Sequence, residues 1–348
     1  MRKNYALDMT CGPFFKKILI FSVPLMLTGL LQLAYNTADV VVVGRFVGKE
    51  ALAAVGSTGS LINLFVNLFI GISMGSGVVV ARHIGENNDK GVRECVHTSM
   101  LLSIFCGFFI GVLGFFTSGE MLKIMNAPDD VIDLATLYLK IYFLGSPGLM
   151  AYNFGAAIVR STGDTKRPLY ILTFSGLVNV ALNLFFVIVL KFGVSGVAIP
   201  TIISQYLSAL LIIIHLKRMN NACRLSFRSL RIHSAELRDI LRIGLPAGIQ
   251  SSLFSVSNVV IQSTVNSFGS SAMAGVAAGS NYDAYIYTCT NAISQTTMTF
   301  ASQNMGARKY SNLGRVYRHC LLITLAIGVG MGLLGMAFGD FIVGLFSD

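Results

Sequence analysis

Long apolar stretches recur along the whole chain and limit its possible folds more than any other feature. Nine are long enough for a membrane-spanning helix, which needs ~20 apolar residues; their approximate limits are 18–43, 51–81, 96–116, 131–159, 169–190, 194–216, 243–268, 271–301 and 320–346. Only 12% of the residues are charged and the mean hydropathy is +0.69, whereas soluble domains carry roughly 25% charged residues. The sequence therefore predicts an all-α polytopic membrane protein, with candidate kinks at Pro24, Pro147, Pro200 and Pro246.

Basic residues gather in alternate loops of this predicted topology. With the amino terminus in the cytoplasm, 21 Lys and Arg residues fall on the cytoplasmic side and four on the other, and Lys140 lies within the fourth span. Such a bias sets the orientation of membrane proteins. The net charge of +10 therefore reflects topology and contact with anionic lipid, and no nucleic-acid partner is expected. We predict a multi-pass protein of the plasma (inner) membrane with a cytoplasmic amino terminus.

An internal repeat divides the predicted spans. The matches are Pro24 with Pro246 and Asn36 with Asn258 at an offset of 222, then Gly85 with Gly306, and Gly107, Gly111 and Gly114 with Gly328, Gly332 and Gly335, at an offset of 221. One copy contains six spans, so both copies enter the membrane from the same side, as in known transporters with parallel repeats. The second copy is present only as its first three helices.

Three regions follow from this repeat. We expect an amino-terminal six-helix lobe at 1–216, a basic cytoplasmic linker at 217–236, and the first three helices of a carboxy-terminal lobe at 237–348. Three further spans would extend to about residue 440 by the same offset. We therefore expect this sequence to be a truncated or partial form of a longer chain.

Polar side chains lie along one face of several spans, since residues three and four apart share a helix face. The candidate cavity-lining residues are Gln32, Tyr35, Asn36, Asn63, Asn67, Asn258 and Tyr287. Asp39 and Asp283 add carboxylates, which are costly inside a membrane and usually functional. Carboxylate, amide and hydroxyl oxygens suit a sodium ion or a proton.

Structural explanations for these polar residues stay open. Asn and Gln side chains often only join membrane helices by hydrogen bonds. Asp39 lies ~33 Å along the helix from Lys17 and could simply reach the outer headgroups. Lys140 is expected to extend outward rather than to form a site.

Short motifs occur in a particular order along the chain. They are Pro24 with Asn36, Asp39 and Gly44-Arg45; Arg160-Ser-Thr-Gly-Asp-Thr-Lys-Arg-Pro168; Asn179 with Asn183; Gly193-Val-Ser-Gly-Val-Ala-Ile-Pro-Thr201; Gly244-Leu-Pro246; and Gln303-Asn-Met-Gly-Ala307. With this spacing and the six-helix repeat, the chain resembles the multidrug and toxic compound extrusion (MATE) transporters over all nine spans.

The resemblance implies a fold and a function. MATE transporters form a V of two six-helix lobes around a central cavity, and they export cationic or amphipathic drugs and toxic compounds by alternating access in exchange for protons or sodium. By resemblance, Asp39, Asn179, Asn183 and Thr201 match the cation site of the amino-terminal lobe, with sodium possible at Asp39. One branch carries Asp at the position of Asn183, so proton and sodium coupling both stay open here.

The resemblance also places further residues. Some members carry a glutamate at the position of Phe254, which makes Asp283 the expected acidic site of the second lobe. Pro24 is the expected hinge of the first span. We expect no cofactor other than the coupling ion, and a monomer that handles small cationic substrates in the lipid bilayer.

Two other functions are considered. A lipid-linked oligosaccharide flippase of the same superfamily would need a large cationic cavity, whereas Lys140 is the single Lys or Arg within the predicted spans and Asp39 and Asp283 are acids there. A membrane enzyme would need clustered catalytic groups, but the five histidines are far apart in sequence. The sequence also lacks a GxxxxGK[ST] phosphate loop for ATP. We predict a cation-coupled antiporter that is not an enzyme, and the flippase is the alternative.

Overall fold

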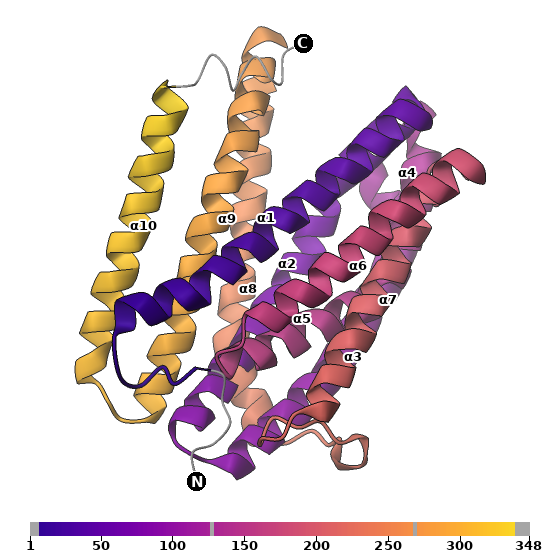
Figure 1. Ribbon diagram of the computed structural model, residues 1–348. Helices are drawn as coiled ribbons and strands as arrows, with labels where there is room; N and C mark the ends of the chain where they lie inside the picture. Colours follow the sequence, from indigo (N-terminus) through magenta and orange to yellow (C-terminus); the bar gives the residue numbers. More distant parts are fainter. Residues whose placement is uncertain (1–6, 126–128, 267–269, 338–348) are drawn as a thin grey trace.

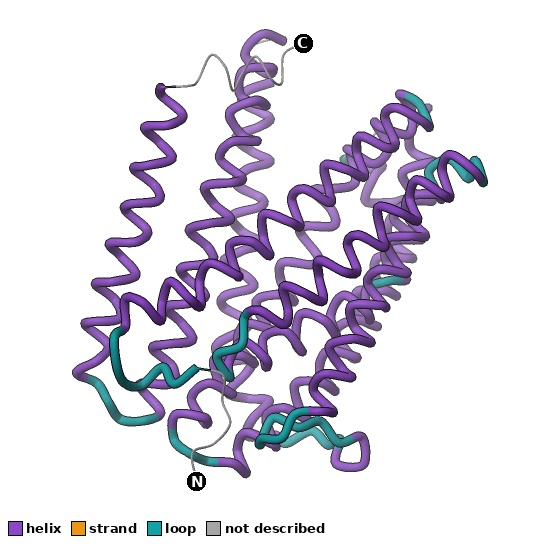
Figure 2. Tube along the Cα trace, viewed as in Figure 1, coloured by secondary structure: helices purple, strands orange, loops and turns teal. Residues whose placement is uncertain are grey.

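The computed structural model describes residues 7–125, 129–266 and 270–337, and these are helices joined by short loops (Figure 2). The long helices are α1 (Phe14–Phe46), α2 (Lys49–Gly85), α3 (Asp89–Ile124), α4 (Asp129–Leu144), α5 (Ser146–Ser161), α6 (Lys166–Leu184), α7 (Ser195–Arg218), α8 (Ser234–Asn266), α9 (Ser270–Gly306) and α10 (Ser311–Ala337). A π-turn, η1 (Phe185–Val189), follows α6, and a short 3-10 turn, η2 (Phe227–Ser229), lies between α7 and α8. The predicted all-α class is confirmed.

Within the part of the chain that the structure describes, six helices are long and apolar enough to cross a membrane. They are α1, α2, α3, α6 together with η1, α7, and α10 extended to Tyr310. The other three predicted spans coincide with the α4–α5 pair, α8 and α9. The fourth span is not continuous, since α4 ends at Leu144 and α5 begins at Ser146. Pro147 explains this break, because proline has no N–H to continue the helical hydrogen bonds.

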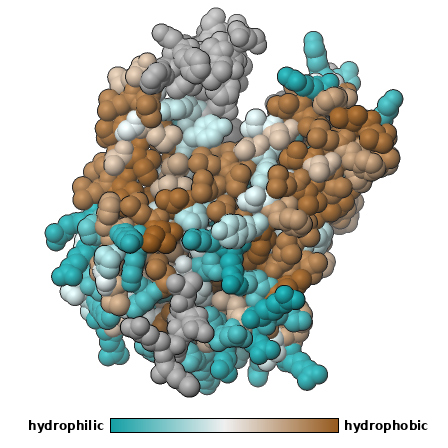
Figure 3. All heavy atoms as spheres, viewed as in Figure 1, coloured by the Kyte–Doolittle hydropathy of each residue, from teal (hydrophilic) through white to brown (hydrophobic). Residues whose placement is uncertain are grey.

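The helices form two groups that converge at one end and diverge at the other (Figure 1). Helices α8 to α10 form one group, which we call the carboxy lobe, and α2 to α7 form the amino lobe. Helix α1 crosses from the base of α9 and α10 to the far end of α6, and it packs against all three. The molecular surface is hollowed between the two groups at the diverging end (Figure 3).

Glycines let the two lobes touch backbone to backbone. A Cβ atom on Gly71 of α2 would lie only 2.2 Å from the backbone nitrogen of Gly248 of α8, and one on Gly75 would lie 2.7 Å from that of Gly244. Small residues allow such close approach of membrane helices. Gly71 and Gly75 therefore serve the close packing of α2 against α8.

A second close contact lies at the converging end. A Cβ atom on Gly85 would lie 2.1 Å from the carbonyl oxygen of Gln303, and one on Gly306 would lie 2.0 Å from that of Arg82. Each glycine thus faces the carbonyl group three residues before the other glycine. The contact joins the end of α2 to the end of α9 and leaves no room for side chains between them.

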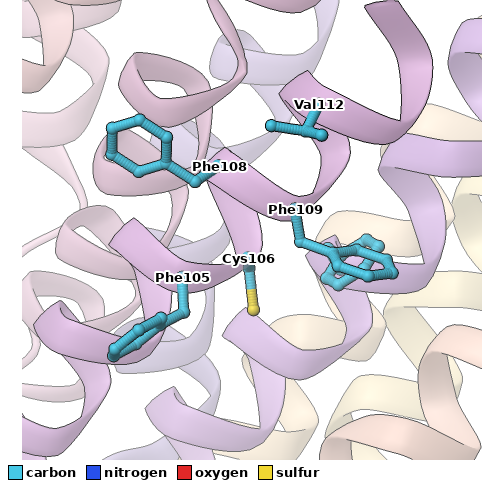
Figure 4. Close-up of a pocket in the computed structure, with 6 residues that line it drawn as sticks. Phe105, Cys106, Phe108, Phe109 and Val112 are labelled. Atoms are coloured by element: carbon cyan, nitrogen blue, oxygen red, sulfur yellow. The ribbon is translucent and has the colours of Figure 1, made fainter. Parts of the chain in front are cut away.

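The outer faces of the helices are apolar, and polar residues gather at the end where the two groups converge (Figure 3). A shallow depression of about 540 Å³ on α3 and the adjoining part of α2 is lined by Phe69 of α2 and by Phe105, Cys106, Phe108, Phe109 and Val112 of α3 (Figure 4). Phe105, Phe108 and Phe109 are each more than half exposed. This surface suits lipid acyl chains, and it lies apart from the polar residues described next.

Candidate functional site

Asp39 of α1 faces α6. Its Oδ1 atom accepts a hydrogen bond from the Nδ2 atom of Asn183, which is completely buried. Asp39 itself is partly buried. The carboxylate is therefore held inside the amino lobe and does not extend freely to the headgroups.

Asn179 lies one helical turn before Asn183, on the same face of α6. Its amide is best satisfied when Nδ2 donates to Oδ1 of Asp39 at 3.1 Å and its oxygen accepts from the backbone nitrogen of Thr201 at 3.3 Å. In this orientation two amides donate to one carboxylate oxygen. Hydrogen bonds of this kind favour the ionised carboxylate.

Thr201 brings α7 to the same place. Its hydroxyl donates to the carbonyl oxygen of Val197 at 2.9 Å, and the hydroxyl oxygen lies 3.4 Å from the side-chain amide of Asn179. Because a hydroxyl has one proton and two lone pairs, its acceptor side remains available. The four residues predicted as a cation site are thus brought together.

The amide oxygen of Asn183 is buried and has no hydrogen-bond partner among the residues that the structure describes. A buried polar atom without a partner lowers stability by roughly 1–3 kcal/mol, so a ligand that binds this oxygen would recover that free energy. With the Asp39 carboxylate and the Thr201 hydroxyl it supplies three kinds of oxygen that hard cations accept. The residues therefore fit a sodium ion or a proton.

The local structure explains how these side chains are placed. The π-turn η1 begins two residues after Asn183, and such turns are frequent at functional sites. The hydroxyl of Tyr35 donates to the carbonyl oxygen of Thr173 at 3.2 Å. A Cβ atom on Gly176 would lie 2.1 Å from the Tyr35 ring. These contacts fix the rotation of α1 against α6 and so aim Asp39 at Asn183.

Comparisons with known proteins identify the family. The MatE family model matches residues 24–185 and 246–348. The chain belongs to the MATE family. The predicted family is therefore confirmed, and with it a multi-pass membrane transporter.

Curated relatives agree with this assignment, and a solved structure shares the fold. A probable multidrug resistance protein, YoeA of Bacillus subtilis, is 29% identical over 334 residues, which are 94% of this chain and 72% of the relative. An FAD transporter of Shewanella oneidensis is 25% identical over 85% of this chain and 66% of its own length. A multidrug resistance MATE transporter in an outward-facing conformation superposes with a TM-score of 0.92 at 24% identity, covering 100% of this chain and 77% of that one.

Sequence reasoning did not single out two tyrosines that lie near the Asp39 site. Tyr138 and Tyr142 of α4 stack with ring centroids 6.3 Å apart. Tyr138 is 6% exposed and packs in an apolar cluster with Val42 and Val43, one turn beyond Asp39. Their i, i+4 spacing was the available signal, but aromatic residues are common in membrane spans.

The predicted cavity-lining residues separate into two sets. Gln32, Asn36, Asn63, Asn258 and Tyr287 are exposed. Tyr35 packs on α6, as described above, and Asn67 of α2 donates to Ser255 of α8 at 3.3 Å. The structure thus assigns Tyr35 and Asn67 to helix contacts, in agreement with the interhelical alternative. Pro24 is buried inside α1, and its carbonyl oxygen accepts from the Thr28 hydroxyl at 2.7 Å.

Asp283 lies on a different part of the molecule. It is exposed on α9, where the neighbouring Tyr282 hydroxyl donates to Met331 of α10 at 2.5 Å. Tyr287, one turn later, stacks on Phe254 of α8 with ring centroids 5.6 Å apart. At about 100° per residue, Asp283 faces between α8 and α10, away from the Thr288 contact with α1. It does not join the Asp39 site.

Proposed function

We propose that this MATE transporter is an antiporter that exports cationic or amphipathic small molecules across the plasma membrane in exchange for protons or sodium. The observation that carries the proposal is the Asp39 carboxylate, which receives the Asn183 amide while the Asn183 oxygen stays buried without a partner. A single cation can neutralise the carboxylate and satisfy that oxygen. The site therefore has two states that differ in charge.

Loading the site would change the contact between α1 and α6. Hydrogen bonds from amides stabilise the charged carboxylate, whereas a proton or sodium ion at Asp39 competes with them. Because Pro24 interrupts the hydrogen bonding of α1, this helix can bend below the site. Each inward charge supplies roughly 2.3 kcal/mol per 100 mV, which can drive a drug outward by alternating access.

Membrane orientation and repeat symmetry are part of the proposal. The clustering of Lys and Arg favours a cytoplasmic amino terminus, so the lobes converge on the cytoplasmic side. The reciprocal contact at Gly85 and Gly306 supports two parallel repeats, because the 221-residue offset exchanges Gly85 with Gly306 and Arg82 with Gln303. The lobe limits 1–216 and 237–348, with the linker 217–236 between them, follow this repeat.

Cationic cargo is favoured by the charges within the spans. Lys140 lies with its ammonium nitrogen 5.6 Å from the centre of the Phe115 ring. Asp39 of α1 and Asp283 of α9 are acids, and Asp283 is the second-lobe site of this proposal. Three relatives are named probable multidrug resistance proteins, and one is named an FAD transporter. A lipid-linked oligosaccharide flippase stays the alternative and would require transport of an anionic lipid.

Transport into inside-out vesicles tests the proposal. Uptake of a cationic dye should depend on an imposed proton or sodium gradient, with the two gradients applied separately. Asp39→Asn should abolish this coupled uptake while the protein stays in the membrane. Asp133→Asn, which changes an exposed acid of α4, is the matched control. Dye uptake that ignores both gradients, or full coupling in Asp39→Asn, would contradict the mechanism.

A further inference from the structure

The segment just before α1, residues 7–12, runs between the two lobes at their converging end (Figure 1). We call it the amino-terminal clasp. Three side chains of the carboxy lobe hold its backbone. Asn304 donates to the carbonyl oxygen of Met9 at 2.9 Å, and Lys309 and Asn312 each donate to that of Thr10 at 3.1 Å.

The clasp also contacts the amino lobe. Gly163, in the loop between α5 and α6, has a φ of +92°. A Cβ atom there would lie 2.6 Å from the Cβ atom of Leu7. Only glycine leaves space for Leu7 at this point, since its φ lies in the left-handed region and its neighbour is so close. The same short segment therefore rests on both lobes.

Apolar packing anchors the middle of the clasp. Met9 is completely buried in a cluster with Phe14 and Phe21 of α1, Phe300 of α9 and Val316 of α10. Burying a methionine side chain stabilises a contact by about 1.5–3 kcal/mol in water. The middle of the clasp is thus packed into the apolar core and does not lie as a tail on the surface.

Hydrogen bonds join the clasp rigidly to α1. Lys17, in the first turn of α1, donates to the carbonyl oxygens of Asp8 at 2.5 Å and Cys11 at 2.6 Å. Burial acts to raise the pKa of Asp8, but hydrogen bonds from Cys11 and Thr10 and the Lys17 charge bring it below the usual value. Asp8 is therefore ionised and holds the turn of the clasp, so that the clasp and the base of α1 move together.

Two motifs noted in the sequence meet at the clasp although neither belongs to the Asp39 site. Gln303 donates to the carbonyl oxygen of Ser161 at 2.7 Å, which joins the carboxy lobe directly to the end of α5. Asn304, the next residue, holds Met9. The 303–307 motif thus binds the amino lobe and the clasp side by side, and the 160–168 motif supplies Ser161 and Gly163 on the other side.

We propose that the amino-terminal clasp is a lock that keeps the two lobes closed at this end, and that displacement of α1 releases it. Phe14 and Asp39 lie on one helix, ~38 Å apart along its axis, so a shift of α1 at the cation site can reach the clasp. Locking itself does not depend on the transport activity. The link to Asp39 rests on the proposed function.

Thiol labelling tests the lock without a transport assay. Thr299 of α9 lines a cavity of about 30 Å³ between the lobes, together with Ala157 and Arg160 of α5. In protein with Cys11→Ser and Cys289→Ser, which removes the two thiols that are not buried, a Thr299→Cys thiol should react with a charged maleimide faster when the lobes part. Adding Lys309→Ala and Asn312→Ala removes hydrogen bonds to the clasp, and labelling should become roughly fivefold faster.

Lys166→Ala, which changes an exposed lysine on the same side outside the clasp, is the matched control and should leave labelling unchanged.

A second experiment holds the clasp in place covalently. Thr10→Cys and Asn312→Cys are joined by a short thiol crosslinker in the Cys11→Ser and Cys289→Ser background. The crosslink should slow the labelling of Thr299→Cys by a fluorescent maleimide, and samples without crosslinker provide the comparison. Equal labelling in the loosened variant and the Lys166→Ala control, or unchanged labelling after crosslinking, would overturn the lock. Faster labelling together with failed ion-coupled uptake would retain the lock and reject the proposed function.

Discussion

Asn183 donates a hydrogen bond to Asp39 while its own amide oxygen, buried in the amino lobe, is left without a partner among the described residues. This pairing makes Asn183 a specific test of the cation site. Asn183→Leu removes both the donor and the oxygen, and we expect ion-coupled uptake to fall at least tenfold, since about 1.4 kcal/mol of lost cation binding suffices.

Asn183→Asp supplies a charged oxygen at the same place and is the informative partner variant. It should keep coupled uptake and shift its dependence on sodium or proton concentration, because a second carboxylate attracts a cation more strongly. The measurement is dye uptake against ion concentration for both variants. Wild-type ion dependence in Asn183→Leu would remove Asn183 from the site.

Thr201 tests the hydroxyl contribution from α7. Thr201→Val keeps the shape of the side chain but removes the oxygen near Asn179, so the apparent affinity for the coupling ion should fall by roughly tenfold. Thr201→Ser keeps the hydroxyl and should stay within about threefold of wild type. The half-saturating ion concentration of dye uptake is the measured quantity, and equal values for the Val and Ser variants would argue against an oxygen ligand.

The backbone contact between α2 and α8 predicts a stability effect. Gly71→Ala places a methyl group 2.2 Å from the Gly248 nitrogen, and such overpacking typically costs about 1–3 kcal/mol. The midpoint of thermal unfolding in detergent should fall. Gly59→Ala, in the same helix but with nothing within 4 Å of its added methyl, is the control and should unfold at or above the wild-type temperature. Similar unfolding midpoints for the two variants would show that the contact between α2 and α8 can widen at Gly71 without loss of stability.

His83 of α2 and Glu236 of α8 form a further interaction between the lobes. The Nε2 atom of His83 lies 3.0 Å from a Glu236 oxygen, and its Nδ1 atom lies 2.9 Å from a Glu86 oxygen. His83 and Glu236 are both at most 9% exposed. Because breaking a buried pair costs about 3–5 kcal/mol, Glu236→Ala should strongly lower the unfolding midpoint.

Glu120→Ala is the comparison for this pair. Its ion pair with Lys123 is well exposed, and exposed pairs contribute roughly 0–1 kcal/mol. The unfolding midpoint of Glu120→Ala should therefore stay close to wild type. A Glu236→Ala variant as stable as Glu120→Ala would mean that the buried pair does not hold the lobes together.

The positions of the helices could be predicted from the sequence because spanning a bilayer is a local property of apolar run length. The i, i+4 spacing of Asn179 and Asn183 likewise placed both amides on one helix face. Pro147 was a predicted kink and lies at the break between α4 and α5. The choice of Asp39, Asn179, Asn183 and Thr201 as one site came from family resemblance, and the structure brings these residues together.

Only the tertiary structure decided how each helix is rotated and tilted. That rotation turns Asp39 toward Asn183, 144 residues away, and it leaves Asp283 exposed on α9. It also brings Tyr138 near the site and seats Met9 beside Asn304, 295 residues away. In a chain whose helices are apolar on nearly every face, hydrophobic periodicity does not reveal which face meets which neighbour. Close contacts at glycines and a few hydrogen bonds determine that choice.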